Sequence, residues 1–189
     1  MKYKINLFID KSDYVKKISL DNIINVTGSV GSGKSTYGFK YRKNPKYIVL
    51  ELDSLCNDND PDTLNDEVKE LREFLNKKYD NFSSMNINDY YCDIISFFEK
   101  SDKKVIIEGG CLADNSLISK LKGTIIVKRT ARFKCYYRSA YRDFKNPAWR
   151  NNLNTIGLIK RFFHCFKRRF KCLFRQKQFE NFIRQLDEL

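Results

Sequence analysis

At 189 residues, 42% of them hydrophobic and 14% aromatic, the chain can bury a core and is too apolar for a disordered protein, so we expect a single domain over 1–189. The chain has 36 Lys and Arg and 23 Asp and Glu, which gives a net charge of +13. The basic residues are concentrated in 128–177, and this predicts an anionic ligand, unless they form only a solvated basic face. No run approaches the ~18 apolar residues of a spanning helix, so no transmembrane segment is expected.

The six cysteines form no metal-binding or disulfide pattern. They are widely spaced, no two make a C-x-x-C pair, and the chain has one histidine, His164, so zinc is not expected. The N-terminal stretch MKYKINLFIDKSDYVKK meets a charge every few residues and lacks the apolar run of a signal peptide. We therefore expect a cytoplasmic protein with reduced thiols.

The first twenty residues contain two short alternations of apolar and polar positions, at 2–9 and 14–20, separated by DKSD. Such alternation is typical of strands with one exposed face. We expect residues 1–20 to form a β-hairpin at the edge of a sheet.

Four apolar runs of strand length follow, and they are continuous rather than alternating. This pattern suits strands that are covered on both faces by helices. The runs lie at 22–27, 46–52, 105–108 and 123–129.

Helices are expected between and after these runs, as in the segment where Leu64, Val68, Leu71 and Leu75 recur at spacings of three and four. The predicted helices lie at 62–79, 86–100, 131–144, 154–170 and 177–189, and KCLFR at 171–175 could be a fifth strand. Strands that alternate with helices predict an α/β fold with an open parallel sheet and right-handed crossovers.

The stretch INVTGSVGSGKSTYGFKY holds four of the eight glycines within eleven positions. Gly28, four further residues, and then Gly33, Lys34 and Ser35 match G-x-x-x-x-G-K-[ST], the phosphate-binding loop, placed between a strand and a helix. Glycine is needed there because a Cβ would block the backbone conformations that turn several N–H groups toward one polyphosphate.

We expect this loop to bind ATP with Mg²⁺. Lys34 supplies a positive charge for the β and γ phosphates, and the Ser35 hydroxyl is a ligand for Mg²⁺. The predicted nucleotide-binding residues are Gly28, Ser29, Val30, Gly31, Ser32, Gly33, Lys34, Ser35 and Thr36.

With no guanine-reading N-K-x-D loop, the chain resembles the small phosphoryl-transfer kinases of the P-loop class, which include nucleoside, nucleotide, gluconate, shikimate and polynucleotide 5′-hydroxyl kinases. The resemblance rests on GSVGSGKST, VLELDSL, KVIIEGG and IIVKRTARFKCYYRSAYRD and spans most of 22–189. It implies a three-layer α/β/α P-loop NTPase fold with a mostly parallel five-stranded sheet. The C-terminal part looks most like the bacterial DNA topology modulation (FlaR-like) group, although LELDSLCNDN lacks that group's tryptophan.

Two carboxylates follow predicted strands, where open α/β sheets bind their ligands. By resemblance, Asp53 accepts the proton of the attacking hydroxyl or fixes the acceptor, although it could instead cap the next segment. Glu108 would hold Mg²⁺ or contact the acceptor, with a purely structural role as the alternative.

Arg138 and Arg142 occupy the place where the resembled kinases carry lid arginines. Forked guanidinium groups stabilise the charge that spreads over the transferred phosphoryl group. We expect a lid at 138–155. Arg150 is a third candidate for a lid arginine, and Trp149 could contact adenine or serve as packing. Arg129 and Arg132 are lesser candidates, and an exposed helix position is the alternative for each arginine.

The basic helix that contains Phe162, Phe163, Phe166 and Phe170 has aromatic residues at core spacing, and we interpret this side as core packing. Nucleic-acid binding and attachment to a membrane surface are the alternatives. His164 and Cys165 are interpreted as packing residues.

The sequence as a whole therefore predicts a kinase that moves the γ-phosphoryl group of ATP to a small acceptor, most simply a nucleoside or nucleotide bound by an insertion at 54–100. One alternative is a polynucleotide 5′-hydroxyl kinase whose basic C-terminal half binds nucleic acid. The other is an ATPase switch that binds a partner.

Overall fold

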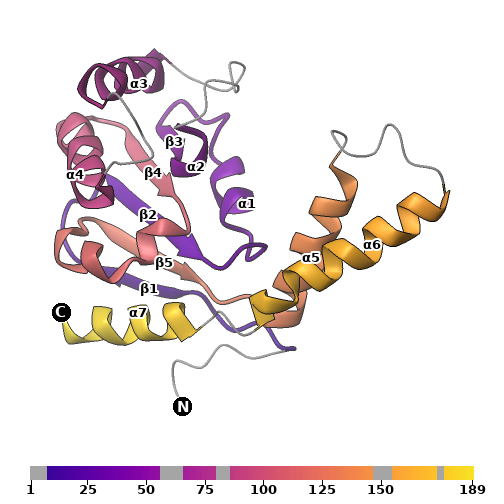
Figure 1. Ribbon diagram of the computed structural model, residues 1–189. Helices are drawn as coiled ribbons and strands as arrows, with labels where there is room; N and C mark the ends of the chain where they lie inside the picture. Colours follow the sequence, from indigo (N-terminus) through magenta and orange to yellow (C-terminus); the bar gives the residue numbers. More distant parts are fainter. Residues whose placement is uncertain (1–7, 56–65, 80–85, 147–154, 174–176) are drawn as a thin grey trace.

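A five-stranded mixed sheet forms the centre of the molecule in the computed structural model, which describes residues 8–55, 66–79, 86–146, 155–173 and 177–189 (Figure 1). Its strands are β1 (Tyr14–Lys17), β2 (Ile23–Gly28), β3 (Tyr47–Glu51), β4 (Lys104–Glu108) and β5 (Thr124–Lys128). The strand order is β1-β5-β2-β4-β3. Every pair is parallel except β1 with β5, so the fold is α/β, and the four continuous apolar runs are confirmed as strands.

The N-terminal hairpin is not found in the described part of the chain. Residues 2–7 of its first arm lie outside that part, and Phe8 and Ile9 form a bend. The second arm is β1, which pairs with β5 so that Tyr14 lies opposite Val127. β1 is therefore an edge strand, as expected, but its partner comes from much later in the chain.

The strand suggested at KCLFR is wrong for the residues that are described, because Phe170–Leu173 form a 3₁₀ helix, η6. β1 therefore completes the five-stranded sheet. The remaining helices are α1 (Lys34–Phe39), α2 (Leu52–Leu55), α3 (Asp66–Lys78), α4 (Ile87–Phe98), η3 (Cys111–Ala113), η4 (Asn115–Lys120), α5 (Arg132–Lys145), α6 (Thr155–Arg169) and α7 (Lys177–Glu188).

Both faces of the sheet are covered, because successive side chains of a buried strand point to opposite sides. Ile107 of β4 joins a large core that includes residues of α3, α4 and α7, whereas the neighbouring Ile106 joins a small cluster with Tyr37 of α1. Figure 1 shows α3 and α4 on one side of the sheet and α1 on the other. Helix α1 contacts β2, β3 and β4.

Helices α5 and α6 pack on each other and extend away from the sheet as a helical hairpin (Figure 1). Asp10 holds the base of this hairpin, because its carboxylate accepts hydrogen bonds from the backbone N–H of Ala131 (2.8 Å) and from Lys134 Nζ (2.5 Å). These two bonds hold the pKa of Asp10 below its usual value, with the Lys134 bond as the larger cause.

The aromatic side of α6 does not pack into the core as expected. Phe163 is 67% exposed and Ile159 is 54% exposed, whereas Phe166 is half-buried against Tyr136 and Tyr137 of α5. The apolar residues of α6 therefore divide between a buried contact with α5 and an exposed stripe.

The two remaining packing predictions on α6 have opposite outcomes. Cys165 is buried, as expected, whereas His164 is exposed.

Within the described ranges, the longest apolar helical stretches are too short or too polar to span a bilayer.

Candidate functional site

A cavity of about 440 Å³ lies at the carboxyl edge of the parallel strands, between the glycine-rich loop, β3, β4 and α5. The loop, residues 28–33, leaves the end of β2 and leads directly into α1. The lining residues are Val30, Gly31, Gly33, Lys34, Ser35, Thr36, Glu51, Glu108, Gly109, Arg138, Ser139 and Arg142. Most of the predicted site residues are therefore brought to one place.

The loop adopts backbone conformations that favour glycine. Gly31 has φ of +80° and Gly33 has φ of +93°, in the left-handed region that other residues rarely occupy. A Cβ on Gly31 would also lie only 2.5 Å from the carbonyl oxygen of Cys135 in α5. The backbones of the loop and α5 therefore lie so close together at Gly31 that no side chain fits between them.

Lys34 folds back over the loop. Its Nζ donates hydrogen bonds to the carbonyl oxygens of Gly28 (2.9 Å) and Ser29 (3.1 Å). The ammonium group therefore lies against the first residues of the loop, and Lys34 lines the cavity.

The loop is also fixed from the side of α5. Thr130 Oγ1 donates to the carbonyl oxygen of Ser32 (2.7 Å), and Ser29 Oγ donates to Cys135 Sγ (3.4 Å). Burial raises the pKa of the Cys135 thiol, so this thiol stays neutral and serves as packing. Ser32 is almost fully buried and is not among the residues that line the cavity.

Two glutamates lie side by side at the edge of the sheet. Glu51 ends β3, Glu108 ends β4, and the two are partners in the parallel register. Partners in neighbouring strands project from the same face of a sheet, and both residues line the cavity. Glu108 is only 4% exposed, and Glu51 forms an ion pair with Arg42.

Glu51 was not among the residues predicted from the sequence. Its place near the end of the apolar run KYIVLEL was the only signal, and the catalytic carboxylate was assigned instead to the next charged residue, Asp53. Asp53 belongs to α2, and its side chain lies outside the described part.

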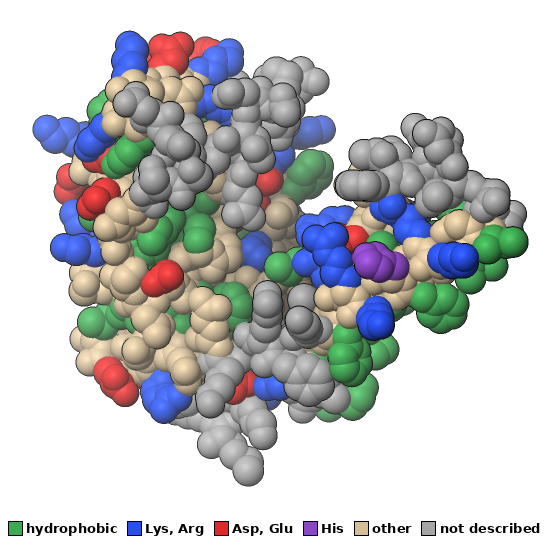
Figure 2. All heavy atoms as spheres, viewed as in Figure 1, with side chains coloured by type: hydrophobic (Ala, Val, Ile, Leu, Met, Phe, Trp, Pro, Cys, Tyr) green, Lys and Arg blue, Asp and Glu red, His purple; other side chains and the backbone are tan. Residues whose placement is uncertain are grey.

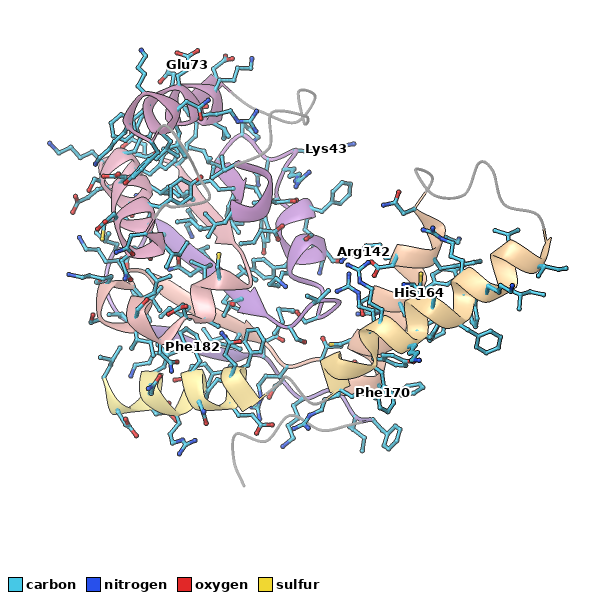
Figure 3. All side chains as sticks on the ribbon, viewed as in Figure 1. Lys43, Glu73, Arg142, His164, Phe170 and Phe182 are labelled. Carbon is cyan, nitrogen blue, oxygen red and sulfur yellow. The ribbon has the colours of Figure 1, made fainter. Side chains whose placement is uncertain are left out.

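The two predicted arginines line the cavity from α5. Arg138 and Arg142 are four residues apart, so they share one face of the helix. Figure 3 shows Arg142 on the side of the hairpin that faces the sheet and α1. With Lys34 they place three positive charges around the cavity.

The other arginine candidates have different outcomes. Arg132 forms an ion pair with Glu180 of α7 (2.6 Å), which gives it a structural role, and Arg129 is not among the cavity-lining residues. Trp149 and Arg150 fall in 147–154, a part of the expected lid that lies outside the described residues.

The predicted metal ligands suit Mg²⁺ only as part of a shell that also contains waters and phosphate oxygens. The described residues contain no group of three or more His, Cys, Asp or Glu side chains that could hold a metal ion. Mg²⁺, however, usually keeps several waters and takes one or two protein oxygens together with phosphate oxygens. The Ser35 hydroxyl and the Glu108 carboxylate line the same cavity and could supply such oxygens.

Comparison with known proteins found no match: neither a protein-family model, a curated protein nor a solved structure is similar enough to this chain to indicate its family. The site is therefore interpreted from its own chemistry.

Proposed function

We propose that this protein is an ATP- and Mg²⁺-dependent phosphotransferase with a P-loop NTPase fold, and that it moves the γ-phosphoryl group to a small acceptor such as a nucleoside or nucleotide. One observation supports this proposal above all. A single cavity is lined by the glycine-rich loop, the Lys34 ammonium, the Ser35 hydroxyl, the Glu108 carboxylate and two arginines.

The loop and Lys34 would bind the β and γ phosphates. The carbonyl oxygens that now accept hydrogen bonds from Lys34 lie in the same loop, so a small rotation of the side chain exchanges them for phosphate oxygens. The exchange favours a polyanion, because a hydrogen bond between two charged groups is stronger than one to a neutral carbonyl. Ser35 and Glu108 would hold Mg²⁺ between them.

Arg138 and Arg142 would stabilise the charge of the transferred group. Positive groups that are already positioned around a cavity act on developing charge without reorganisation during the reaction. Because both arginines come from one helix, a small movement of the hairpin would bring them together onto the γ-phosphoryl group.

Two carboxylates remain candidates for the proton acceptor. Asp53 is the prediction from sequence, and Glu51 is the residue that lines the cavity. The ion pair with Arg42 fixes the position of the Glu51 side chain, which suits a group that orients an acceptor hydroxyl.

A transfer assay with γ-labelled ATP and Mg²⁺ tests the proposal over nucleosides, nucleotides, sugars and 5′-hydroxyl oligonucleotides. We expect Lys34→Met to lower the transfer rate by at least about 100-fold, whereas Lys120→Met, which removes an exposed lysine on η4, leaves it unchanged. Comparison of Asp53→Asn with Glu51→Gln identifies the proton acceptor.

Two results would contradict the proposal. Failure of the purified protein to retain MgATP at millimolar concentration would remove the nucleotide site. Release of phosphate without a labelled acceptor would favour the ATPase switch.

A further inference from the structure

A second hollow, of about 450 Å³, lies between α5 and α6. It is lined by Asp143, Asn146, Arg161, His164, Cys165 and Arg168. The proposed transfer reaction does not use any of these residues. The hollow therefore needs an explanation of its own.

The hollow carries excess positive charge. Its carboxylate, Asp143, already accepts two hydrogen bonds from Arg169, at 2.6 and 2.9 Å, so that pair is neutral. Arg161 and Arg168 add two further positive charges to the lining. The sequence of α6, TIGLIKRFFHCFKRR, contains no acidic residue.

The geometry favours a phosphate group over a simple counterion. Arg161, His164 and Arg168 lie three and four residues apart, so they form one face of α6. Guanidinium forks match the oxygens of a phosphate, the imidazole adds a ring N–H, and the side chain of Asn146, the residue after α5, supplies an amide. Cys165, buried at 6% exposure, gives the hollow an apolar floor.

The second hollow is adjacent to the first cavity through α5. Arg142 lines the cavity, whereas the next residue, Asp143, lines the hollow. Arg138 and Arg142 lie one turn, or about 6 Å, apart along α5, and Asn146 follows directly after the last residue of that helix. Figure 2 shows the positive side chains gathered beside His164, where the hairpin faces the main body across a recess. Because α5 contributes residues to both sites, a ligand that extends from the hollow past α5 would approach Arg142.

We infer that the hollow between α5 and α6 binds a phosphate group of the acceptor, so that the acceptor of this enzyme is a phosphate-bearing molecule, either a nucleotide or a nucleic-acid end, rather than a free nucleoside or sugar. The inference rests on the proposed transfer reaction, which it makes more specific.

The exposed apolar stripe of α6 does not belong to this site. Ile159 and Phe163 are four residues apart and therefore lie in one row along α6. That row lies on a different side of the helix from Arg161, His164 and Arg168. A membrane would contact the stripe, whereas the hollow is closed on one side by α5. Lys160 lies between the two faces and does not line the hollow, so it is a matched control.

Calorimetric binding tests the inference on the full chain saturated with a nonhydrolysable MgATP analogue. The probes are adenosine, adenosine 3′-monophosphate, adenosine 5′-monophosphate and a single-stranded hexaadenylate with a free 5′ hydroxyl. We expect at least one phosphate-bearing probe to bind at least about tenfold more tightly than adenosine. Arg168→Glu should abolish this preference, and Lys160→Glu should retain it within about twofold. The mononucleotide and oligonucleotide probes distinguish the two sources of phosphate.

Several results would overturn the inference. Equal losses in Arg168→Glu and Lys160→Glu would indicate a general field of charge, and equal affinity for adenosine and the phosphate probes would remove the site. Binding to phosphatidylserine vesicles without binding to any probe would assign the hairpin to a membrane. Binding of the analogue alone is measured first in each variant: its absence from the unmodified protein contradicts the proposed function, whereas normal analogue binding without phosphate preference contradicts only the inference.

Discussion

The close approach of Gly31 to the carbonyl of Cys135 couples the glycine-rich loop to α5, the helix that carries both cavity arginines. The position is restricted twice, by φ of +80° and by the lack of room for a side chain. A left-handed conformation alone costs about 1–2 kcal/mol for a residue with a Cβ. The clash with backbone atoms cannot be relieved by rotating a side chain.

We therefore expect Gly31→Ala to lower the free energy of unfolding by about 2 kcal/mol or more and to weaken MgATP binding, because the loop must separate from α5. Gly110→Ala is the control, since a Cβ there would meet no atom within 4 Å and φ is −69°. Urea denaturation and nucleotide titration measure the two effects. Equal behaviour of the two variants would show that the loop and α5 do not depend on this contact.

At the scale of elements, the joint between α5 and α6 depends on Asp143. Its carboxylate accepts two hydrogen bonds from Arg169, and its main-chain carbonyl accepts one from Arg161 (2.9 Å). The bond from Arg169 holds the pKa of Asp143 below its usual value. A carboxyl whose pKa is lower in the folded state stabilises the fold at pH values above its unfolded pKa, and this contribution disappears as the pH falls through the folded pKa.

We expect Asp143→Asn to lower the free energy of unfolding by about 1–2 kcal/mol at neutral pH. The difference from the unmodified protein should persist down to about pH 4, the ordinary Asp pKa, and should vanish at lower pH. Denaturation series at several pH values measure it. Asp21→Asn is the control, because its pair with Lys17 is exposed, and a constant deficit for Asp143→Asn at every pH would contradict the ionic account.

The apolar residues of α6 and α7 have opposite environments, although both helices are amphipathic. Phe163 of α6 is 67% exposed, whereas Phe182 of α7 is fully buried. We expect Phe163→Ser to change the free energy of unfolding by less than about 0.5 kcal/mol and Phe182→Ala to lower it by about 3–5 kcal/mol. Chemical denaturation compares them, and a large loss in Phe163→Ser would show that the stripe is covered.

This contrast shows what periodicity can predict. Both helices follow from apolar residues at spacings of three and four, because that spacing defines one face of a helix. It does not say whether the face is buried in the core, as at Phe182, or remains exposed, as at Phe163. Helix boundaries were therefore predictable here, but whether other residues cover the apolar face of α6 was not.

The parallel strands were predictable for a related reason. Continuous apolar runs such as KYIVLEL favour a strand that is covered on both faces, and the structure has β3 there, with buried and half-buried residues in alternation. The pairing of β1 with β5 joins segments more than a hundred residues apart, and no local pattern specifies it. Likewise, the motif identified Lys34, but Glu51 enters the cavity only because its strand is registered beside Glu108.

At the scale of the whole molecule, the two parts of the proposed site belong to regions with different packing. Among the described residues, the large core cluster draws on the sheet, on α3, α4 and α7 and on the 3₁₀ helices η3 and η4, but on neither α5 nor α6. The hairpin is held instead by its own aromatic contacts, by the Asp143–Arg169 pair and by Asp10 at its base. Free energies of local opening follow the density of such buried contacts.

We therefore expect amide hydrogen exchange to show lower opening free energies in α5 and α6 than in β2 and β4. A nonhydrolysable MgATP analogue should slow exchange in residues 28–35 and in the turns of α5 that carry Arg138 and Arg142, because the bound phosphates would join the loop to the hairpin. Exchange in α3 and α7 should not change, which makes these helices an internal control. Protection of the loop without protection of α5 would mean that the arginines do not act on the bound nucleotide, and the transfer chemistry would then have to rely on Lys34 and Mg²⁺ alone.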